Sequence, residues 1–332
     1  MPDIQRRTFL QGSLAAGACA IAAPLRARGP ASFPPPDLER MVAVPGGRVY
    51  VRANGALKGG KPPLVMIHGG PGSTHGGFLP ALALADERAI ILYDQLGSGR
   101  SDPITPADWK VPRFVAELEP IRRALGVERW HVLGGSWGGT IALEYGALRP
   151  PALASLILAS PLVSTRRWLA DANALRSKLP ADVRQALDRC DPPASASAAC
   201  ATASEQYNSR YLAREPRMSA VIAYAEAQQK AGGRGFNNAL YQGMWGSTEF
   251  IATGTLRDYD GEPLLAKLDG RHTLFMVGQY DEARPVTAAD FAERVPGAEL
   301  AVVPGAGHAI PSDRPDEYNA ILRNWLRRQD QA

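Results

Sequence analysis

The sequence predicts an α/β protein with a doubly wound, mostly parallel sheet and an inserted helical cap. Short apolar runs alternate with helical segments along most of the chain, as is typical of a parallel sheet covered by helices. Several of these runs end in glycine-rich segments with polar residues, and open α/β sheets place their sites at such strand ends. Between residues 161 and 257 the apolar runs vanish while helical periodicity continues, which indicates a cap rather than an unstructured loop.

The apolar runs give the expected strands in chain order. Residues 41–44 and 48–52 flank a Pro-Gly-Gly turn, and they predict an antiparallel hairpin with one solvated face. Continuous apolar runs predict strands buried on both faces, at residues 63–67, 89–93, 130–133, 155–159, 273–277 and 299–303. Helices are expected over residues 113–125, 140–148, 286–295 and 316–328, and within the insertion over 168–178, 183–189, 204–212 and 218–230.

The length of 332 residues suits one large α/β domain with an insertion, or two small domains. The patterns favour the first arrangement. We predict a signal segment at 1–27, a Pro-rich linker at 28–36, an α/β core formed by 37–160 and 258–330, and the helical cap at 161–257.

The first residues have the features of a twin-arginine export signal. Arg6-Arg7 precedes a charge-free segment rich in Ala and Gly from Leu10 to Leu25, which is too weakly apolar for a typical membrane span. We therefore expect the twin-arginine export machinery as a partner and a periplasmic or secreted protein. A frayed amphipathic helix is one alternative, and a lipoprotein modified at Cys19 is another.

Composition and charge exclude some classes of protein. Hydrophobic residues make up 45% of the chain and charged residues 21%, which is ordinary for a globular protein with a full core. The net charge of +4 comes partly from the signal segment, and no basic stripe indicates nucleic acid binding. No run is apolar and long enough to predict a stable membrane span.

Cys190 and Cys200 lie in a stretch rich in Pro, Ala and Ser. In an oxidising compartment they could close a small loop as a disulfide, and two free thiols are the alternative. Their spacing matches no metal site.

The motif G-x-S-x-G at residues 134–138 lies where an apolar run meets a helical segment. A sharp strand-to-helix turn is the context of the nucleophile elbow of an α/β-hydrolase. The turn strains the serine backbone, and glycines avoid clashes of neighbouring Cβ atoms. An ordinary glycine-rich turn is the alternative for this motif taken alone.

Three residues at strand ends supply the parts of a serine hydrolase. Ser136 is the expected nucleophile, His308 the base and Asp281 the acid that orients it, and the order Ser, Asp, His is the one used by this fold. The oxyanion donors are expected to be the backbone N–H groups of Gly70 and Trp137. Such a site needs no metal or cofactor.

Each of these assignments has an alternative. His308 could be a surface loop histidine, and Asp281 could be a helix N-cap with Glu282 in its place. His68, which also ends a strand, is expected to shape the oxyanion turn. We expect Asp94 to hold a turn.

With these motifs the sequence resembles the prolyl iminopeptidase family of α/β-hydrolases over roughly residues 40–328. The most specific motif is H-G-G-P-G at 68–72. It is supported by four further motifs, which are D-Q-x-G-x-G-x-S at 94–101, G-G-S-W-G-G at 134–139, G-x-x-D at 278–281 and G-H at 307–308. The resemblance implies a serine aminopeptidase that releases an N-terminal residue, typically proline, from small peptides.

The resemblance also implies a cap glutamate that binds the α-ammonium of the substrate. Glu249, in the segment G-S-T-E-F at 246–250, occupies the similar position. A second cap acid could be Glu205 or Glu226, and the alternative is that Arg210 or Arg214 occupies that neighbourhood. A solvated surface role is the alternative for Glu249.

Two other functions stay open at this point. The same triad could act on an amino acid amide or a carboxylic ester, and the fold could also serve as a silent ligand-binding protein. The side chain preferred at the first position depends on cap geometry. Four aromatic residues could line that pocket or simply pack the cap, namely Trp137, Phe236, Tyr241 and Trp245.

Overall fold

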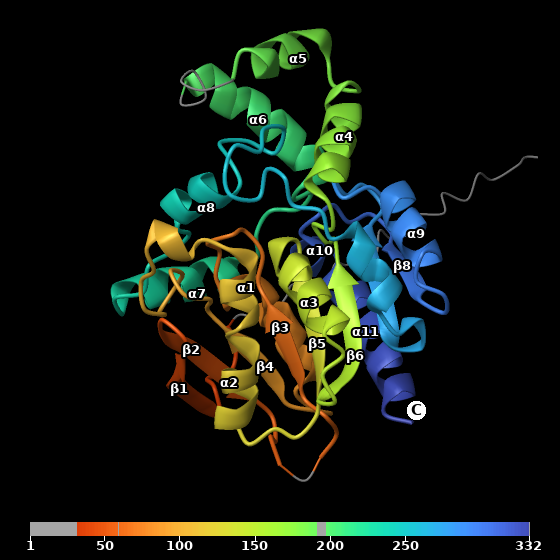
Figure 1. Ribbon diagram of the computed structural model, residues 1–332. Coiled ribbons are helices and arrows are strands. Elements are labelled where there is room, and N and C mark those ends of the chain that lie inside the picture. Colours follow the sequence, from red (N-terminus) through yellow and green to blue (C-terminus); the bar gives the residue numbers. More distant parts are fainter. Residues whose placement is uncertain (1–31, 59, 191–196, 332) are drawn as a thin grey trace, which may run out of the picture.

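The computed structural model describes residues 32–58, 60–190 and 197–331 (Figure 1). The predicted signal segment and the first residues of the Pro-rich linker therefore lie outside the described residues. Within them, an eight-stranded sheet forms with the order β1-β2-β4-β3-β5-β6-β7-β8. The predicted α/β fold with a doubly wound, mostly parallel sheet is confirmed.

The strands follow the apolar runs closely. β1 and β2 form the predicted antiparallel hairpin, β2 pairs antiparallel with β4, and all other neighbours are parallel. The strand bounds are β1 Leu38–Val44, β2 Gly47–Asn54, β3 Leu64–Ile67, β4 Ile90–Tyr93, β5 Trp130–Gly135, β6 Leu153–Ala159, β7 Thr273–Gly278 and β8 Glu299–Val303.

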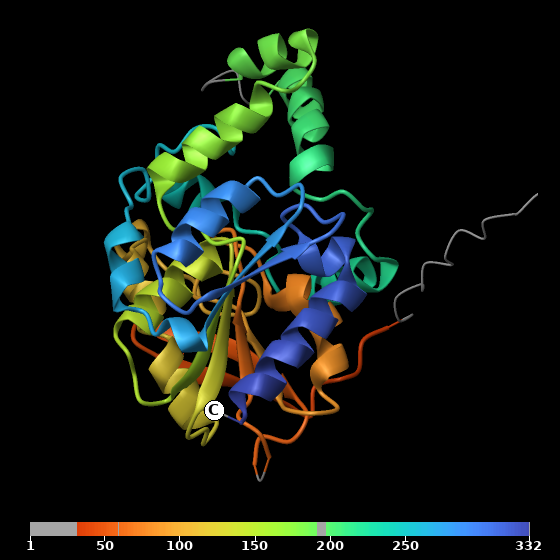
Figure 2. The same ribbon diagram turned by 90° about the vertical axis from the view of Figure 1, so that its right-hand side faces the viewer.

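Helices cover both faces of the sheet (Figures 1 and 2). One face carries α1 (Val111–Val115), α2 (Leu118–Ala124), α3 (Trp137–Ala147) and α9 (Pro285–Glu293). The other face carries the 3-10 helix η1 (His75–Leu84), α10 (Ile310–Asp313) and α11 (Pro315–Gln329). Two short 3-10 helices, η4 (Glu262–Lys267) and η5 (Gly270–His272), precede β7, and η2 (Pro106–Asp108) precedes α1.

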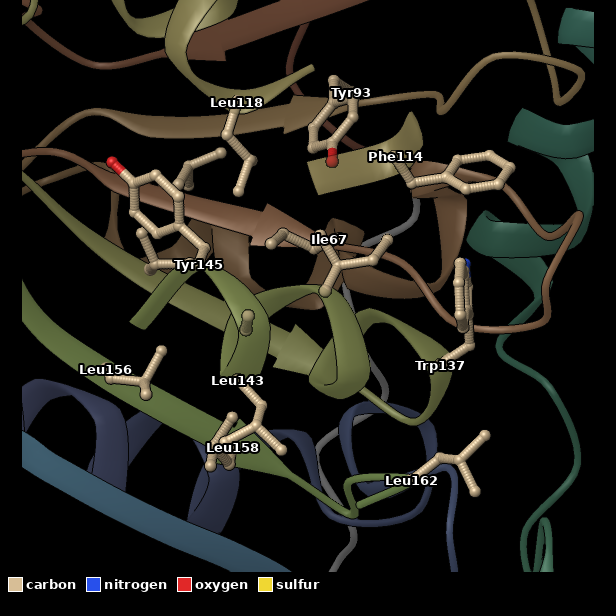
Figure 3. Packing of buried hydrophobic residues seen from close by; sticks show 14 of the residues in the cluster. Ile67, Tyr93, Phe114, Leu118, Trp137, Leu143, Tyr145, Leu156, Leu158 and Leu162 are labelled. Carbon is tan, nitrogen blue, oxygen red and sulfur yellow. The ribbon is translucent and has the colours of Figure 1, made fainter. Parts of the chain in front are cut away.

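The central strands alternate between two apolar clusters. In β3, for example, Val65 and Ile67 belong to the cluster under α3, whereas Leu64 and Met66 belong to the cluster under α11. Successive side chains of a strand point to opposite faces, so a strand covered on both sides must be apolar throughout. Figure 3 shows part of the first cluster, in which Trp137 packs near Phe114.

Between β6 and β7 the described chain forms a cap of helices, as expected from the periodicity. They are α4 (Thr165–Arg176), α5 (Ala181–Asp188), α6 (Ala198–Tyr211), α7 (Ser219–Lys230) and α8 (Asn238–Met244). Cys190 and Cys200 are joined in a disulfide beside an apolar cluster of α4, α5 and α6. The periodicity did not predict α8, because a seven-residue helix spans only about two turns.

The predicted helix over 113–125 is instead two helices, α1 and α2, with a break at Ala116 and Glu117. Glu117 is fully buried, and its Oε1 accepts the backbone N–H of Leu96 at 3.2 Å. Its Oε2 has no hydrogen-bond partner among the described residues. Burial raises the pKa of Glu117 to about 8.

Among the described residues, no helix combines the length and the apolar character that crossing a membrane requires.

Glu117 should make the stability of the fold depend on pH. In the unfolded chain a glutamate ionises near pH 4.3 (about the value of a model peptide), whereas in the fold Glu117 keeps its proton up to about pH 8. Between these two pKa values the folded state therefore binds more protons than the unfolded chain. The free energy of unfolding is largest below this range and falls as the pH rises to about 8. Glu117→Gln should remove this loss.

Urea unfolding at several pH values between 5 and 9 measures the effect. Relative to Glu117→Gln, the wild type should lose free energy of unfolding as the pH rises, with no further loss above about pH 8. The exposed Glu128→Gln is the matched control and should follow the wild type. Parallel curves for wild type and Glu117→Gln would contradict the prediction.

Candidate active site

The site is built around a strained turn between β5 and α3. Ser136, between the last residue of the strand and the first of the helix, has φ 56° and ψ −123°. A positive φ is uncommon for a residue with a side chain, and it persists only where the surroundings impose it. Gly138 allows the start of α3 to pack this closely against β3, because a Cβ at position 138 would lie 2.0 Å from the carbonyl oxygen of Ile67. The turn exposes Ser136 to a cavity of about 450 Å³.

Asp281 and His308 meet at the same edge of the sheet. Asp281 lies just after β7, and His308 lies in the loop after β8. His308 Nδ1 donates to Asp281 Oδ1 at 2.8 Å, which leaves Nε2 for the cavity that Ser136 also lines. The Ser136 hydroxyl itself forms no hydrogen bond with a described residue, and in unliganded sites such catalytic contacts are often long.

Asp281 is held in place by several donors. Its carboxylate accepts the backbone N–H of Gly278 at 3.1 Å and that of Ala283 at 2.9 Å. The hydroxyl of Ser160 also donates to it. Ser160 is buried at the end of β6 with a φ of 47°, so it is a second strained serine at this edge. Sequence reasoning missed Ser160, although its place directly after an apolar run was a usable signal.

Of the two predicted oxyanion donors, Trp137 directly follows Ser136 and Gly70 lines the same cavity. Trp137 is the first residue of α3, so its N–H has no partner within the helix. The N–H of Gly70 likewise has no acceptor among the described residues. Gly69, before it, comes so close to the elbow that a Cβ there would lie 2.9 Å from Ser136 Cβ.

His68 begins this loop and holds it in place through hydrogen bonds of its imidazole ring. It is buried, its Nδ1 bonds the carbonyl oxygen of Gly69 at 3.0 Å, and its Nε2 accepts the N–H of Gln95 at 3.0 Å. Burial lowers the pKa of His68 to about 4, so the ring is neutral near pH 7. It is not part of the Ser136, Asp281 and His308 group.

Two glutamates line the cavity. Glu249 accepts a hydrogen bond from the hydroxyl of Tyr241 at 2.6 Å. Glu282 is fully buried, and its Oε2 has no hydrogen-bond partner among the described residues. Burial and the negative charge of Glu249 raise the pKa of Glu282 well above its usual value. A cation is the natural partner for such a pair.

The sequence offered two cap glutamates as candidates for a second acid, and the structure brings neither candidate to the site. Glu205 and Glu226 are exposed on α6 and α7 and do not line the cavity. Glu282 comes instead from the core, directly after Asp281. It does not replace Asp281 as the partner of His308, since the imidazole bonds Asp281. A second acid beside a strand-end aspartate was the signal that could have identified it.

The carboxylates also act on the imidazole of His308. Burial by itself lowers the pKa of His308, but the charge and hydrogen bond of Asp281 outweigh it. Together with the charges of Glu282 and Glu249 they raise the pKa to about 9. A positive charge bound between the two glutamates would offset part of this effect.

Aromatic side chains form much of the remaining wall. Trp168 of α4 presents its ring edge-on to His308, with centroids 5.4 Å apart, and it also contacts Trp245. Phe236, Tyr241 and Trp245 line the cavity. The Trp137 side chain does not, because it is buried in the core with its indole N–H bonded to Gln95.

In the part of the chain that the structure describes, no group of three or more His, Cys, Asp or Glu residues is arranged to hold a metal ion.

Comparison with known proteins gives concordant results. Residues 62–315 match the model of the alpha/beta hydrolase fold family. The chain is 34% identical to a proline iminopeptidase of Heyndrickxia coagulans over 291 residues, which covers 87% of this chain and 98% of that protein. A crystal structure of the Mycobacterium smegmatis proline iminopeptidase is 31% identical, with a TM-score of 0.79 over 89% of this chain and 99% of that one.

The geometry predicts that Ser136 is activated and that Ser160 helps to orient Asp281. A fluorophosphonate probe, which needs an activated serine, should label the wild type and fail to label Ser136→Ala. Ser160→Ala should slow labelling about tenfold, because it removes one hydrogen bond to a charged group. Ser98→Ala, a buried serine whose hydroxyl has no partner among the described residues, is the control and should label normally. Labelling that persists in Ser136→Ala would contradict the assignment.

Proposed function

Because this chain belongs to the proline iminopeptidase family of α/β-hydrolases, we propose that it is a serine aminopeptidase releasing an N-terminal residue, preferably proline, from small peptides. One observation carries the proposal beyond family membership. Two carboxylates, Glu249 and Glu282, line the same cavity as Ser136 and His308. A hydrolase for neutral esters has no use for such a pair, whereas an aminopeptidase must bind a free α-ammonium.

The reaction follows from the positions of the side chains. Ser136 Oγ attacks the carbonyl carbon of the first residue while His308 Nε2 takes the hydroxyl proton. The N–H groups of Gly70 and Trp137 donate to the resulting oxyanion. His308 then gives the proton to the leaving amine, the C–N bond breaks, and an acyl-enzyme remains. Water, deprotonated by His308, hydrolyses this ester and releases the free amino acid.

The glutamate pair sets the position of the substrate. An ammonium bound by both carboxylates holds the first residue with its carbonyl against Ser136, so cleavage occurs after one residue only. Each charged hydrogen bond is worth about 1.5–3 kcal/mol, which is enough to discriminate against a blocked amine. The surrounding rings of Trp168, Tyr241 and Trp245 exclude water and suit a compact apolar ring such as that of proline.

The first test compares kcat/KM on proline, alanine and N-acetyl-proline p-nitroanilides. We expect free proline to be preferred and acetylation to abolish turnover. Glu249→Gln and Glu282→Gln should each lower kcat/KM on proline p-nitroanilide about tenfold to a hundredfold, because one charged partner of the ammonium is lost.

The exposed Glu226→Gln is the matched control and should behave as the wild type. Cleavage of the acetylated substrate at a comparable rate would contradict the aminopeptidase proposal and favour a broader amidase or esterase. Failure of the wild type to cleave any of the three substrates would favour a ligand-binding protein.

We also propose that the protein is exported by the twin-arginine machinery to the periplasm or beyond. The Arg6-Arg7 pair and the charge-free segment after it support this proposal, as does the Cys190–Cys200 disulfide, which suits an oxidising compartment. The role of a scavenger of small peptides outside the cytoplasm would follow.

Fusing residues 1–36 to a folded reporter tests export. The wild-type segment should deliver the reporter to the periplasm, and the double variant Arg6→Lys, Arg7→Lys should retain it inside the cell. The single change Arg26→Lys, beyond the pair, serves as the charge-matched control and should not block export. Equal delivery by the double variant would contradict the proposal.

A further inference from the structure

Arg217 lines the same cavity as Ser136 and the two glutamates. It lies in the loop between α6 and α7, and its side chain is exposed. Among the described residues its guanidinium forms no ion pair, side-chain hydrogen bond or ring contact. By contrast, Arg214 in the same loop lies over the ring of Tyr280 at 3.9 Å and does not line the cavity. Arg217 therefore contributes to the cavity wall a positive charge that has no ion-pair partner among the described residues.

The cavity has a different wall on the side of Arg217. One group of lining residues is aromatic, in which Trp168 contacts Trp245 and the hydroxyl of Tyr241 donates to Glu249. A second side is bounded by α7, by the start of η1 and by α10, which contribute Val221, Ala225, Phe78 and Ile310.

Hydrogen bonds fix the loop that carries Arg217 to this second side. The N–H groups of Arg214 and Glu215 both donate to Asp313 Oδ1 of α10 at 2.9 Å. On the far side of Arg217, helix α7 is held to η1 through Tyr224, whose hydroxyl bonds His75 Nε2 at 2.8 Å. Arg217 thus lies on a loop that is held on one side to α10 and on the other, through α7, to η1.

We propose that Arg217 binds the C-terminal carboxylate of the substrate, and that the enzyme acts on di- and tripeptides in preference to longer or C-terminally blocked peptides. The inference rests on the proposed aminopeptidase function. With the ammonium at the glutamates and the scissile carbonyl at Ser136, the leaving amino acid must extend over the second wall. A guanidinium binds a carboxylate through two parallel hydrogen bonds, so it is suited to this end of a zwitterionic peptide.

The volume of the cavity agrees with a short substrate. An extended chain advances about 3.3–3.6 Å per residue, so a tripeptide spans about 10 Å between its charged ends. A cavity of about 450 Å³ falls at the small end of the range for ligand pockets and suits a molecule of this size. Val221, Ala225 and Ile310 then contact the second side chain without selecting it by charge.

The test measures kcat/KM on matched acids and amides. The substrates are prolyl-alanine, prolyl-alanyl-alanine, their C-terminal amides, and proline p-nitroanilide, whose leaving group has no carboxylate. The wild type should prefer at least one free acid over its amide by about tenfold. Arg217→Gln should remove that preference and leave kcat/KM on the amides and on proline p-nitroanilide unchanged. Arg217→Lys should restore part of the preference, because lysine keeps the charge but not the two-pronged geometry.

Arg214→Gln is the matched control, since it removes the same charge from the same loop outside the cavity, and it should keep the wild-type preference. Equal losses on acids and amides in Arg217→Gln would assign Arg217 a general structural role and overturn the proposal. A wild type without preference for either free acid would also overturn it. Cleavage of proline p-nitroanilide with rejection of its N-acetyl derivative separates this failure from a failure of the aminopeptidase function, in which either no substrate or also the acetylated one would be cleaved.

Discussion

The backbone of Ser136 is the constraint on which the rest of the site depends. A positive φ at a residue with a side chain costs about 1–3 kcal/mol, so the surrounding contacts must hold it. The N–H of Ser136 donates to the carbonyl of Ala159 at 2.9 Å, and its own carbonyl accepts the N–H of Gly139 at 2.8 Å. Gly138 lets α3 start directly against β3. Once the serine is fixed at this edge of the sheet, the oxyanion loop, the base and the cap must all converge on it.

Negative charge is concentrated around one imidazole. Asp281, Glu282 and Glu249 all act on His308, and two of these carboxylates are fully buried. Burial and the charge of Glu249 raise the pKa of Glu282 well above its usual value, so this carboxyl group holds its proton more tightly than an exposed glutamate does. In the proposed reaction the substrate ammonium would supply a positive charge here, which would link recognition of the first residue to the protonation of His308.

The cap and the base loop form one hydrogen-bonded unit. The N–H of His308 donates to the carbonyl of Tyr211 at 2.9 Å, and the N–H of Ala309 donates to that of Leu212 at 2.7 Å. Both acceptors lie at the end of α6, the helix that the disulfide joins to the chain after α5. The cap therefore does more than cover the cavity, because its longest helix also positions the loop that carries the base.

The sequence by itself determined the sheet, the sharp turn at Ser136, and the meeting of Ser136, Asp281 and His308 at one edge of the sheet. Apolar runs and glycine-rich strand ends are local patterns, and parallel strands bring their carboxyl ends to one edge whatever the detailed packing. The break between α1 and α2 was not readable, since it accompanies a buried contact between Glu117 and Leu96, 21 positions apart.

Only the tertiary structure decided which acids face the cavity. Glu205, Glu226 and Glu249 look alike as cap glutamates in the sequence, yet only Glu249 lines the cavity, and its partner Glu282 comes from the core. Ser160 and Arg217 likewise were not assigned from the sequence, because the relevant residues are more than 70 positions away. Ser160 donates to Asp281, and Arg217 lines the same cavity as Ser136. Local periodicity specifies which face of an element is buried, but the direction of one side chain into a shared cavity depends on how distant elements pack.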